Sequence, residues 1–305
     1  MARNNFFVDY LKTVMEEDRI LLDEPMSNHT TFRVGGPADY FLKPATIGEL
    51  KSLIRYLNQT DRRYMVIGNG SNLLVGDHGY RGVVVQLLEL CDDIDVNGDT
   101  IIAGAGAKLS EVAQIAAEEG LSGLEFASGI PGSIGGAVVM NAGAYGGEMK
   151  QVVESVEVVT PLGDFFALSN EEMKFGYRMS VVQKARYTVA RVVIRLQRGD
   201  TQDIKKKMLE LSEERRKKQP LNYPSAGSTF KRPEGYFAGK LIMDAGMSGF
   251  AVGGAKVSEK HCGFIVNTGW ASAADILDLI KEVQEKVKTR FGVQLEPEVC
   301  IIGEF

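Results

Sequence analysis

The chain has 305 residues, and 44% of them are hydrophobic, which is enough for substantial packed cores. Its formal net charge is −5, so we expect no general attraction to nucleic acid or to an anionic membrane surface. No apolar run approaches the roughly 20 residues that span a bilayer, and the first residues lack a signal-peptide pattern, so we expect a cytoplasmic globular protein.

The first part of the chain alternates between helical and extended patterns. Apolar spacing predicts a helix over about 5–17 and a strand over 38–43. Thr46, with Glu49 three residues later, forms a capping box and predicts the start of a second helix. A short strand over 64–67 then runs directly into a glycine-rich loop.

The middle third is predicted to be richer in strands. They cover about 83–87, 100–103, 152–160, 164–168 and 186–196. One helix over 109–119 interrupts them and ends at Gly120. These patterns predict an α+β unit.

The last part begins with a charged helix over 203–218. It is followed by an element over 236–245, a strand over 263–267, a long helix over 272–291 and a final strand over 298–302. Three domains are therefore expected, at 1–88, 89–200 and 201–305.

Two glycine-rich loops carry the strongest chemical signal. Gly68-Asn69-Gly70-Ser71-Asn72 follows the strand over 64–67, and Gly129-Ile130-Pro131-Gly132-Ser133-Ile134-Gly135-Gly136 precedes Asn141–Gly146. Such loops let backbone N–H groups converge on a pyrophosphate. Neither has the spacing of a P-loop or of a G-x-G-x-x-G motif. Each alone is consistent with a polar turn, but together they favour a large anionic cofactor.

The charge of one segment differs from that of the whole chain. Nine basic and three acidic residues lie between Arg215 and Lys260, which suits an anionic small molecule. Alternatively, the basic run from Arg215 to Lys218 only completes a helix, where cations oppose the C-terminal dipole. Both interpretations stay open.

The cysteines and histidines form no metal-binding pattern. Cys91, Cys262 and Cys300 are far apart, odd in number and include no C-x-x-C pair, so we expect reduced packing residues. His29, His78 and His261 are also widely separated. No metal is expected.

Six motifs, taken together and in this order, resemble those of the UDP-N-acetylenolpyruvoylglucosamine reductases, flavoproteins of peptidoglycan precursor synthesis. The motifs are Asn28–Gly36, Gly68–Leu74, Gly129–Gly146, Tyr177-Arg178-Met179-Ser180, Ser225–Pro233 and Leu295-Glu296-Pro297-Glu298-Val299. The resemblance implies an FAD-binding fold of the vanillyl-alcohol oxidase type, built from two α+β subdomains over 1–88 and 89–200. A substrate-binding α+β domain follows over 201–305.

The resemblance also implies the reaction and its residues. NADPH reduces a non-covalently bound FAD, which then reduces the enolpyruvyl ether of a UDP-sugar, both substrates using one cleft in turn. Ser228 is the implied proton donor, and Arg178 and Glu298 stabilise the enol. Tyr177, Asn222, Lys231 and Lys256 are implied substrate contacts. The implied cofactor contacts are Arg33, Gly68, Asn69, Gly70, Ser71, Asn72, Leu73, Gly129, Ile130, Pro131, Gly132, Ser133, Gly136, Asn141, Gly143, Ala144 and Tyr145.

Taken without the resemblance, two of these residues have simpler interpretations. Ser228 fits a turn hydroxyl, although the nearby Lys231 and Arg232 would favour its loss of a proton. Glu298 fits a solvated residue at the start of an edge strand. Three other functions also stay open: a flavin oxidase, a non-catalytic flavin-binding module and a sugar-nucleotide transferase.

Two features depart from the common family pattern. Cys300 stands where many members have arginine, so a diphosphate contact is expected to be missing or supplied elsewhere. Arg178 and Ser228 are separated by an interval of 50 residues, as in the subgroup without an extra substrate-covering loop.

Overall fold

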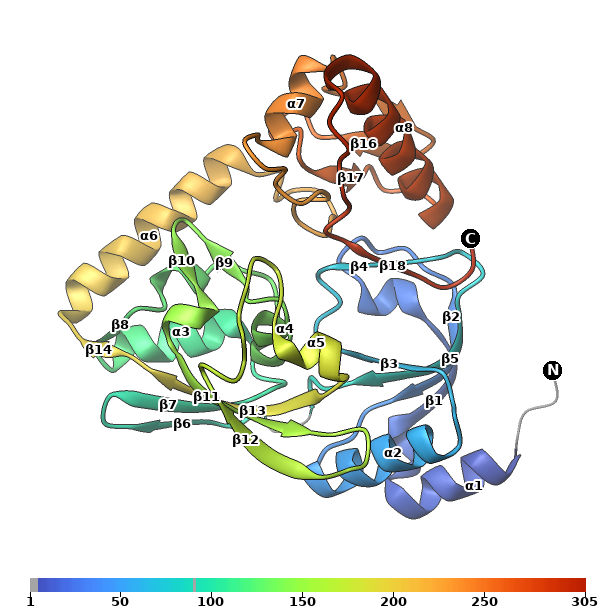
Figure 1. Cartoon of the computed structure of the whole chain (residues 1–305), viewed down its shortest axis with the longest axis vertical. Helices are drawn as coiled ribbons and strands as arrows, with labels where there is room; N and C mark the ends of the chain where they lie inside the picture. Colours follow the sequence, from blue (N-terminus) through green and yellow to red (C-terminus); the bar gives the residue numbers. More distant parts are fainter. Residues whose placement is uncertain (1–4, 90–91) are drawn as a thin grey trace. The chain divides into compact units, whose positions relative to one another are not determined.

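The computed structural model describes residues 5–89 and 92–305, so Cys91 lies outside the described residues. The chain forms two compact units, each built from separate stretches of sequence (Figure 1). Unit 1 takes the described residues of Met1–Leu22, Tyr40–Asn69 and Gly82–Glu213, and unit 2 takes Asp23–Asp39, Gly70–Arg81 and Glu214–Phe305. Each unit has its own hydrophobic core. The three domains expected from the sequence stay a prediction.

Unit 1 contains an antiparallel five-stranded sheet in the order β12-β11-β13-β7-β6. Its central strand, β13, buries five of its eight residues, and four of these five are β-branched. Helix α4 packs against β13 and β7. The members are β6 (Ile94–Asn97), β7 (Thr100–Gly104), β11 (Val153–Val159), β12 (Phe165–Ser169) and β13 (Thr188–Arg195), with α3 (Leu109–Glu118) and α4 (Ile134–Val139).

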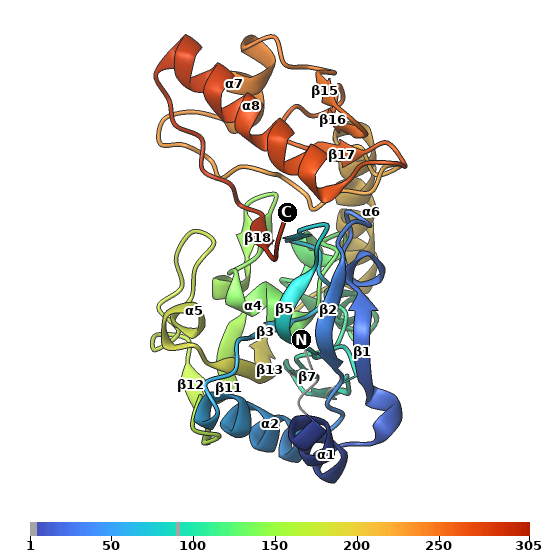
Figure 2. The same cartoon turned by 90° about the vertical axis from the view of Figure 1, so that its right-hand side faces the viewer.

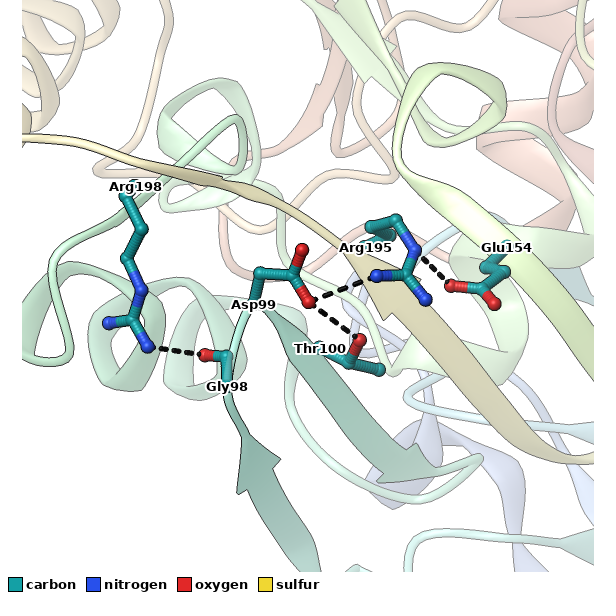
Figure 3. Close-up of polar contacts among 6 residues, drawn as sticks. All are labelled: Gly98, Asp99, Thr100, Glu154, Arg195 and Arg198. Carbon is teal, nitrogen blue, oxygen red and sulfur yellow. Dashed lines mark hydrogen bonds and ion pairs between the residues drawn. The ribbon is translucent and has the colours of Figure 1, made fainter.

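An arginine at the end of β13 links β11 to the turn before β7 (Figure 3). Arg195 Nη1 donates to Asp99 Oδ1 at 3.0 Å, and its Nε donates to Glu154 Oε2 at 2.6 Å. All three side chains are about half exposed. Exposed ion pairs of this kind stabilise a fold by at most about 1 kcal/mol, so the cluster supports a sheet that apolar burial already holds.

A four-stranded sheet, in the order β1-β2-β5-β3, leads to the first glycine loop. Its strands are β1 (Ile20–Pro25), β2 (Pro37–Leu42), β5 (Tyr80–Gln86) and β3 (Tyr64–Ile67), the last two parallel. Helices α1 (Asn5–Val14) and α2 (Ile47–Gln59) pack together. Helix α2 starts as predicted: Thr46 Oγ1 accepts from Glu49 N–H at 3.1 Å, and Glu49 Oε2 accepts from Ala45 N–H at 2.7 Å.

In unit 2, helix α8 (Ala273–Phe291) crosses the antiparallel sheet β15-β16-β17, as Figure 2 shows. The apolar residues that predicted this helix are buried, and its first turn is closed by a capping box of Ser272 and Asp275. Asp77 accepts from the N–H groups of Ala273 and Ala274 at 2.8 and 2.9 Å. The other members are α7 (Ala238–Asp244), β15 (Ala251–Val252), β16 (Ala255–Val257), β17 (Ile265–Asn267) and the parallel pair β4 (Leu73–Val75) and β18 (Cys300–Ile302).

The charged helix α6 (Thr201–Lys218) begins in unit 1 and ends in unit 2. Unit 1 also holds short elements: β8 (Leu121–Ser122), β9 (Gly143–Ala144), β10 (Gly147–Glu148), α5 (Val181–Ala185) and β14 (Gln197–Arg198). Among the described residues, no helix is both long enough and apolar enough to cross a membrane.

The predicted elements are confirmed within a few residues of their ends, but several others were missed, among them β1, β6 and α4. Strands β1 and β6 are mostly polar and only partly covered, so their sequences give weak alternation. Helix α4 contains Gly135 and Gly136 and therefore looks like loop sequence. The last residues of the second glycine loop are thus helical.

His261 provides a test of how unit 2 responds to pH. Its Nδ1 accepts from Gly263 N–H at 3.1 Å, its ring meets Phe264 edge-on at 5.0 Å, and burial lowers its pKa below 6.5. The unfolded state therefore binds more protons, and stability falls as pH drops below about 6.5. Urea unfolding of His261→Gln should show a shallower loss between about pH 7.5 and about pH 5.5. The exposed His78→Gln is the control, and an unchanged slope in His261→Gln would contradict this assignment.

Candidate functional site

The first glycine loop connects β3 to β4 in a conformation that requires glycine. Gly70 has φ +60°, and a Cβ at this position would lie 1.9 Å from the carbonyl oxygen of His29. The Gly70 carbonyl accepts from Thr31 N–H at 3.3 Å. The backbone of 29–31 therefore lies directly against the loop and leaves no room for a side chain.

The same loop presents a row of unused donors. Within residues 5–89 and 92–305, no backbone N–H from Gly68 to Asn72 donates to another group of the protein. Converging N–H groups without internal partners are typical of an anion-binding loop. The residues present therefore fit a pyrophosphate, and their contact with the cofactor stays a prediction.

The second glycine loop meets the first but uses its donors differently. A Cβ on Gly68 would lie 2.2 Å from Ser133 Oγ, so the two loops are in contact there. The N–H groups of Ile134 and Gly135 donate to Ala107 and Ala105 at 2.9 and 3.0 Å. Ser133 caps α4 through Gly136 N–H. The N–H groups at the end of the second loop are therefore used within the protein, whereas those of the first loop are free to bind an anion.

Asn141 fixes the segment that follows α4. It is only 1% exposed and has φ +43°, which asparagine tolerates better than most residues. Its Nδ2 donates to Glu148 Oε2 at 3.0 Å and to Gly176 O at 3.1 Å, and its Oδ1 accepts from Lys150 N–H at 2.9 Å. These three bonds give Asn141 a structural task, and its contact with a cofactor stays a prediction, as do those of Gly143, Ala144 and Tyr145.

Alanine at position 141 should therefore destabilise unit 1. It leaves Lys150 N–H without its partner and removes one of the two donors to Gly176 O, the other being Met179 N–H, at a cost of about 1–3 kcal/mol in the free energy of unfolding. Denaturant unfolding would measure the loss. Asn58→Ala, which removes a half-buried amide on α2 that donates to Ile54 O and the Tyr64 hydroxyl, is the control for amide loss elsewhere. Wild-type stability in Asn141→Ala would contradict the structural role.

Arg178 occupies the tip of a two-residue turn held by α4 and Asn141. Gly176 and Met179 form the closing bridge, and Arg178 has φ +54°. The Arg178 guanidinium lies 5.1 Å from the ring centre of Tyr177, which is exposed. Ser180 Oγ donates to Val139 O at 2.8 Å, which fastens the turn to the end of α4. Both predicted side chains thus stand on a well-supported turn.

Ser228 and Glu298 are 70 residues apart in sequence but lie on neighbouring backbone segments. Glu298 N–H donates to Thr229 O at 2.8 Å, and Phe230 pairs with Pro297 in an antiparallel bridge. Thr229 is 1% exposed, and its Oγ1 accepts from Ile265 N–H at 3.1 Å. The structure therefore brings two of the predicted catalytic residues together.

Thr229 is the residue that the sequence reasoning missed. Its N–H also donates to Gly263 O at 2.8 Å, so it joins the Ser228 segment to both Glu298 and the start of β17. The available signal was a polar residue directly after Ser228 and before the buried Phe230. Because a threonine in such a loop is commonplace, that signal was too weak to identify it.

Asn72 connects the first glycine loop to Glu298. Its Nδ2 donates to Glu298 O at 3.0 Å, and its main-chain carbonyl accepts from Cys300 N–H at 3.0 Å. Leu73, the next residue, is buried in β4. The side-chain amide of Asn72 is therefore used inside the protein.

Three of the four predicted substrate contacts, Asn222, Lys231 and Lys256, lie on the surface of unit 2. Lys231 Nζ is 3.3 Å from Glu296 Oε2, and Lys256 Nζ is 2.6 Å from Glu259 Oε1, whose hydrogen bond and charge raise the pKa of Lys256. Asn222 is exposed. A bound diphosphate would have to compete with these carboxylates, so the roles of all three stay predictions.

Arg33 is a further predicted cofactor contact, and the possible metal ligands are described with it. Arg33 has φ +57°, and its N–H donates to Thr30 O at 3.1 Å. In the part of the chain that the structure describes, no three His, Cys, Asp or Glu side chains are grouped as metal ligands. The described thiols are a buried Cys262 and an exposed Cys300, both free.

Comparisons with known proteins match nearly the whole chain. The family model for an FAD binding domain matches residues 38–169, and the model for the C-terminal domain of UDP-N-acetylenolpyruvoylglucosamine reductase matches 219–302. The chain is 56% identical over 297 residues to the UDP-N-acetylenolpyruvoylglucosamine reductase of Caldanaerobacter subterraneus subsp. tengcongensis. That alignment covers 97% of this chain and 98% of the relative.

Solved structures give the same result for the fold. The crystal structure of UDP-N-acetylenolpyruvylglucosamine reductase from Thermus caldophilus matches with a TM-score of 0.82 and 40% identity, over 93% of this chain and 98% of that chain. Alkyldihydroxyacetonephosphate synthase matches at 15% identity with a TM-score of 0.50, over 64% of this chain and 40% of that chain, which concerns the fold alone. The expected α+β architecture with an FAD-binding region of the vanillyl-alcohol oxidase type is confirmed.

Proposed function

Since this chain belongs to the family of UDP-N-acetylenolpyruvoylglucosamine reductases, we propose that it carries out the family reaction with Ser228, Arg178 and Glu298 as its catalytic residues. It is an FAD-dependent oxidoreductase that uses NADPH to reduce UDP-N-acetylenolpyruvoylglucosamine to UDP-N-acetylmuramate, a step of peptidoglycan precursor synthesis. FAD, when bound, would supply the hydride chemistry that connects NADPH to the enolpyruvyl β-carbon.

The protein's own residues bind the cofactor and complete the second half of the reaction. Gly68 to Asn72 hold the pyrophosphate through their free N–H groups. Arg178 and Glu298 stabilise the enol that hydride addition creates, the guanidinium by pairing with the substrate carboxylate. The Ser228 hydroxyl then donates its proton to the α-carbon.

One observation carries the proposal for the catalytic residues. The hydrogen bond from Glu298 N–H to Thr229 O places the proposed proton donor and the proposed carboxylate on paired segments of backbone. Asn72, at the end of the cofactor loop, is bonded to the main chain of the same Glu298. Asn72, Ser228 and Glu298, which come from three separate motifs, therefore lie on connected backbone segments of unit 2.

Finer parts of the proposal concern substrates and location. NADPH and the UDP-sugar use one cleft in turn, because the sequence holds no second nucleotide-binding motif. Tyr177, Asn222, Lys231 and Lys256 hold the UDP-sugar, and the protein acts in the cytoplasm. The basic residues of the segment from Arg215 to Lys260 support binding of an anionic substrate.

An anaerobic spectroscopic experiment tests the function directly. The purified protein should show the visible spectrum of bound flavin, lose it on addition of NADPH, and regain it when UDP-N-acetylenolpyruvoylglucosamine is added. Mass spectrometry of the product should show a gain of two hydrogens. A flavin that NADPH cannot reduce would indicate a non-catalytic module, and oxygen consumption without any effect of the UDP substrate would indicate an oxidase.

A further inference from the structure

At the start of the β4–β18 ladder, a side-chain amide makes a hydrogen bond that a backbone N–H usually makes. In a parallel ladder, a residue that accepts from one partner residue donates its own N–H to the partner two positions earlier. Asn72 O accepts from Cys300 N–H, so its N–H would be expected to donate to Glu298 O. The bond to Glu298 O is instead made by Asn72 Nδ2, at 3.0 Å.

This exchange of donors at Asn72 has two consequences. The main-chain N–H of Asn72 is left out of the ladder and joins the unpaired donors of Gly68 to Ser71. The main chain of Glu298 is nevertheless held on both sides, its carbonyl by Asn72 and its N–H by Thr229 O at 2.8 Å. The side chains of asparagine and aspartate commonly make hydrogen bonds in place of a nearby backbone group, because their polar atoms extend about as far from the Cα.

We propose that Asn72 is a positioning residue that couples the cofactor loop to the catalytic carboxylate. Its side chain seats Glu298 in register beside the Ser228 segment, and by taking over the ladder bond it leaves its own N–H available to a pyrophosphate. This inference rests on the proposed function and adds to it a residue that acts through Glu298. Without the side chain, the Glu298 carbonyl keeps a ladder donor only when the N–H at position 72 turns away from the anion to provide one.

Asn72→Ala is the variant that tests this role. Asn170→Ala is the matched control, because Asn170 is also a half-buried asparagine whose Nδ2 donates to two main-chain carbonyls, those of Lys150 and Val153 at 2.9 and 2.6 Å. Asn170 makes no hydrogen bond to Glu298 or to the glycine loop. Asn72→Ser keeps a donor with a shorter reach and should recover part of the lost function.

Hydrogen exchange of the FAD-loaded proteins gives a structural readout independent of turnover. In Asn72→Ala, the amides of 296–302 should exchange faster than in wild type, whereas Asn170→Ala should leave this segment unchanged. The FAD dissociation constant should rise by about fivefold to tenfold in Asn72→Ala, because one anion donor is withdrawn. Unchanged exchange at 296–302 together with unchanged FAD affinity would overturn the inference.

Single-turnover kinetics at saturating FAD separate positioning from a general structural defect. Flavin reduction by NADPH should stay close to the wild-type rate in Asn72→Ala, whereas reoxidation by UDP-N-acetylenolpyruvoylglucosamine should slow by roughly 10- to 100-fold. Equal slowing of both half-reactions would overturn the role at Glu298. If the UDP substrate failed to reoxidise even the wild-type flavin, the proposed function would be wrong, while exchange and FAD affinity would still decide whether Asn72 sets the geometry of this ladder.

Discussion

Replacing Ser228 with alanine is expected to separate the two half-reactions. Reduction of the flavin by NADPH needs only hydride transfer and should proceed at nearly the wild-type rate. Reoxidation by UDP-N-acetylenolpyruvoylglucosamine also needs a proton at the α-carbon, and loss of a positioned general acid costs roughly 10²–10⁴-fold. Anaerobic rapid mixing of the pre-reduced variant with substrate measures the second rate directly.

The structure explains why this variant should keep its fold and its substrate affinity. Ser228 is exposed, whereas the hydrogen bonds that anchor its segment come from Thr229. Ser225→Ala, in the same loop, is the control for removing a hydroxyl there. Fast reoxidation in Ser228→Ala, or equal failure of both half-reactions, would show that Ser228 is not the proton donor.

Gly70→Ala should yield protein that has lost its flavin. The new Cβ would stand 1.9 Å from His29 O, a backbone atom, so either the loop or the 29–31 segment must move. The residue would also keep φ near +60°, which costs an L-amino acid about 1–2 kcal/mol. The bound FAD per protein and the melting temperature measure the two effects, and both should fall.

Gly98→Ala separates steric contact from backbone strain. Gly98 has φ +63°, nearly that of Gly70, but a Cβ added there meets no atom within 4 Å. It lies in the turn between β6 and β7, away from both glycine loops in sequence. This variant should lose about 1 kcal/mol of stability and keep its FAD. Equal flavin content in the two alanine variants would mean that the Gly70 loop does not hold the cofactor.

Elements with strong periodicity could be predicted from the sequence because the burial of one apolar face dominates their stability. Helices α2 and α8 bury one apolar stripe each and carry capping residues at their starts, so composition, spacing and caps agree. Helix α4 escaped prediction because its two glycines weaken its propensity, and tertiary contacts with Ala105 and Ala107 stabilise it instead. The composition of unit 2 could not be predicted either, since contacts between distant segments determine it.

In the candidate site, too, some features could be predicted from the sequence and others depend on contacts within the folded protein. The motifs and the family resemblance were enough to select the two glycine-rich loops, Ser228 and Glu298 as candidate site residues. The direction of the Asn72 amide was not, because an asparagine in a loop has several backbone groups within reach and the sequence does not choose among them. The three internal hydrogen bonds of Asn141 could not be predicted either, because they depend on residues up to 35 positions away, and its contact with a cofactor stays a prediction.

The pairing of β4 with β18 constrains the order in which the protein can mature during synthesis. Asn72 and Glu298 are 226 residues apart, so the ribosome releases the cofactor loop long before the segment that completes it. At about 5–20 residues per second, the loop waits ten seconds or more without its partner strand. Apolar residues such as Leu74 stay exposed to chaperones or to other chains during that interval. The first glycine loop therefore gains its bond to the β18 segment only near the end of translation.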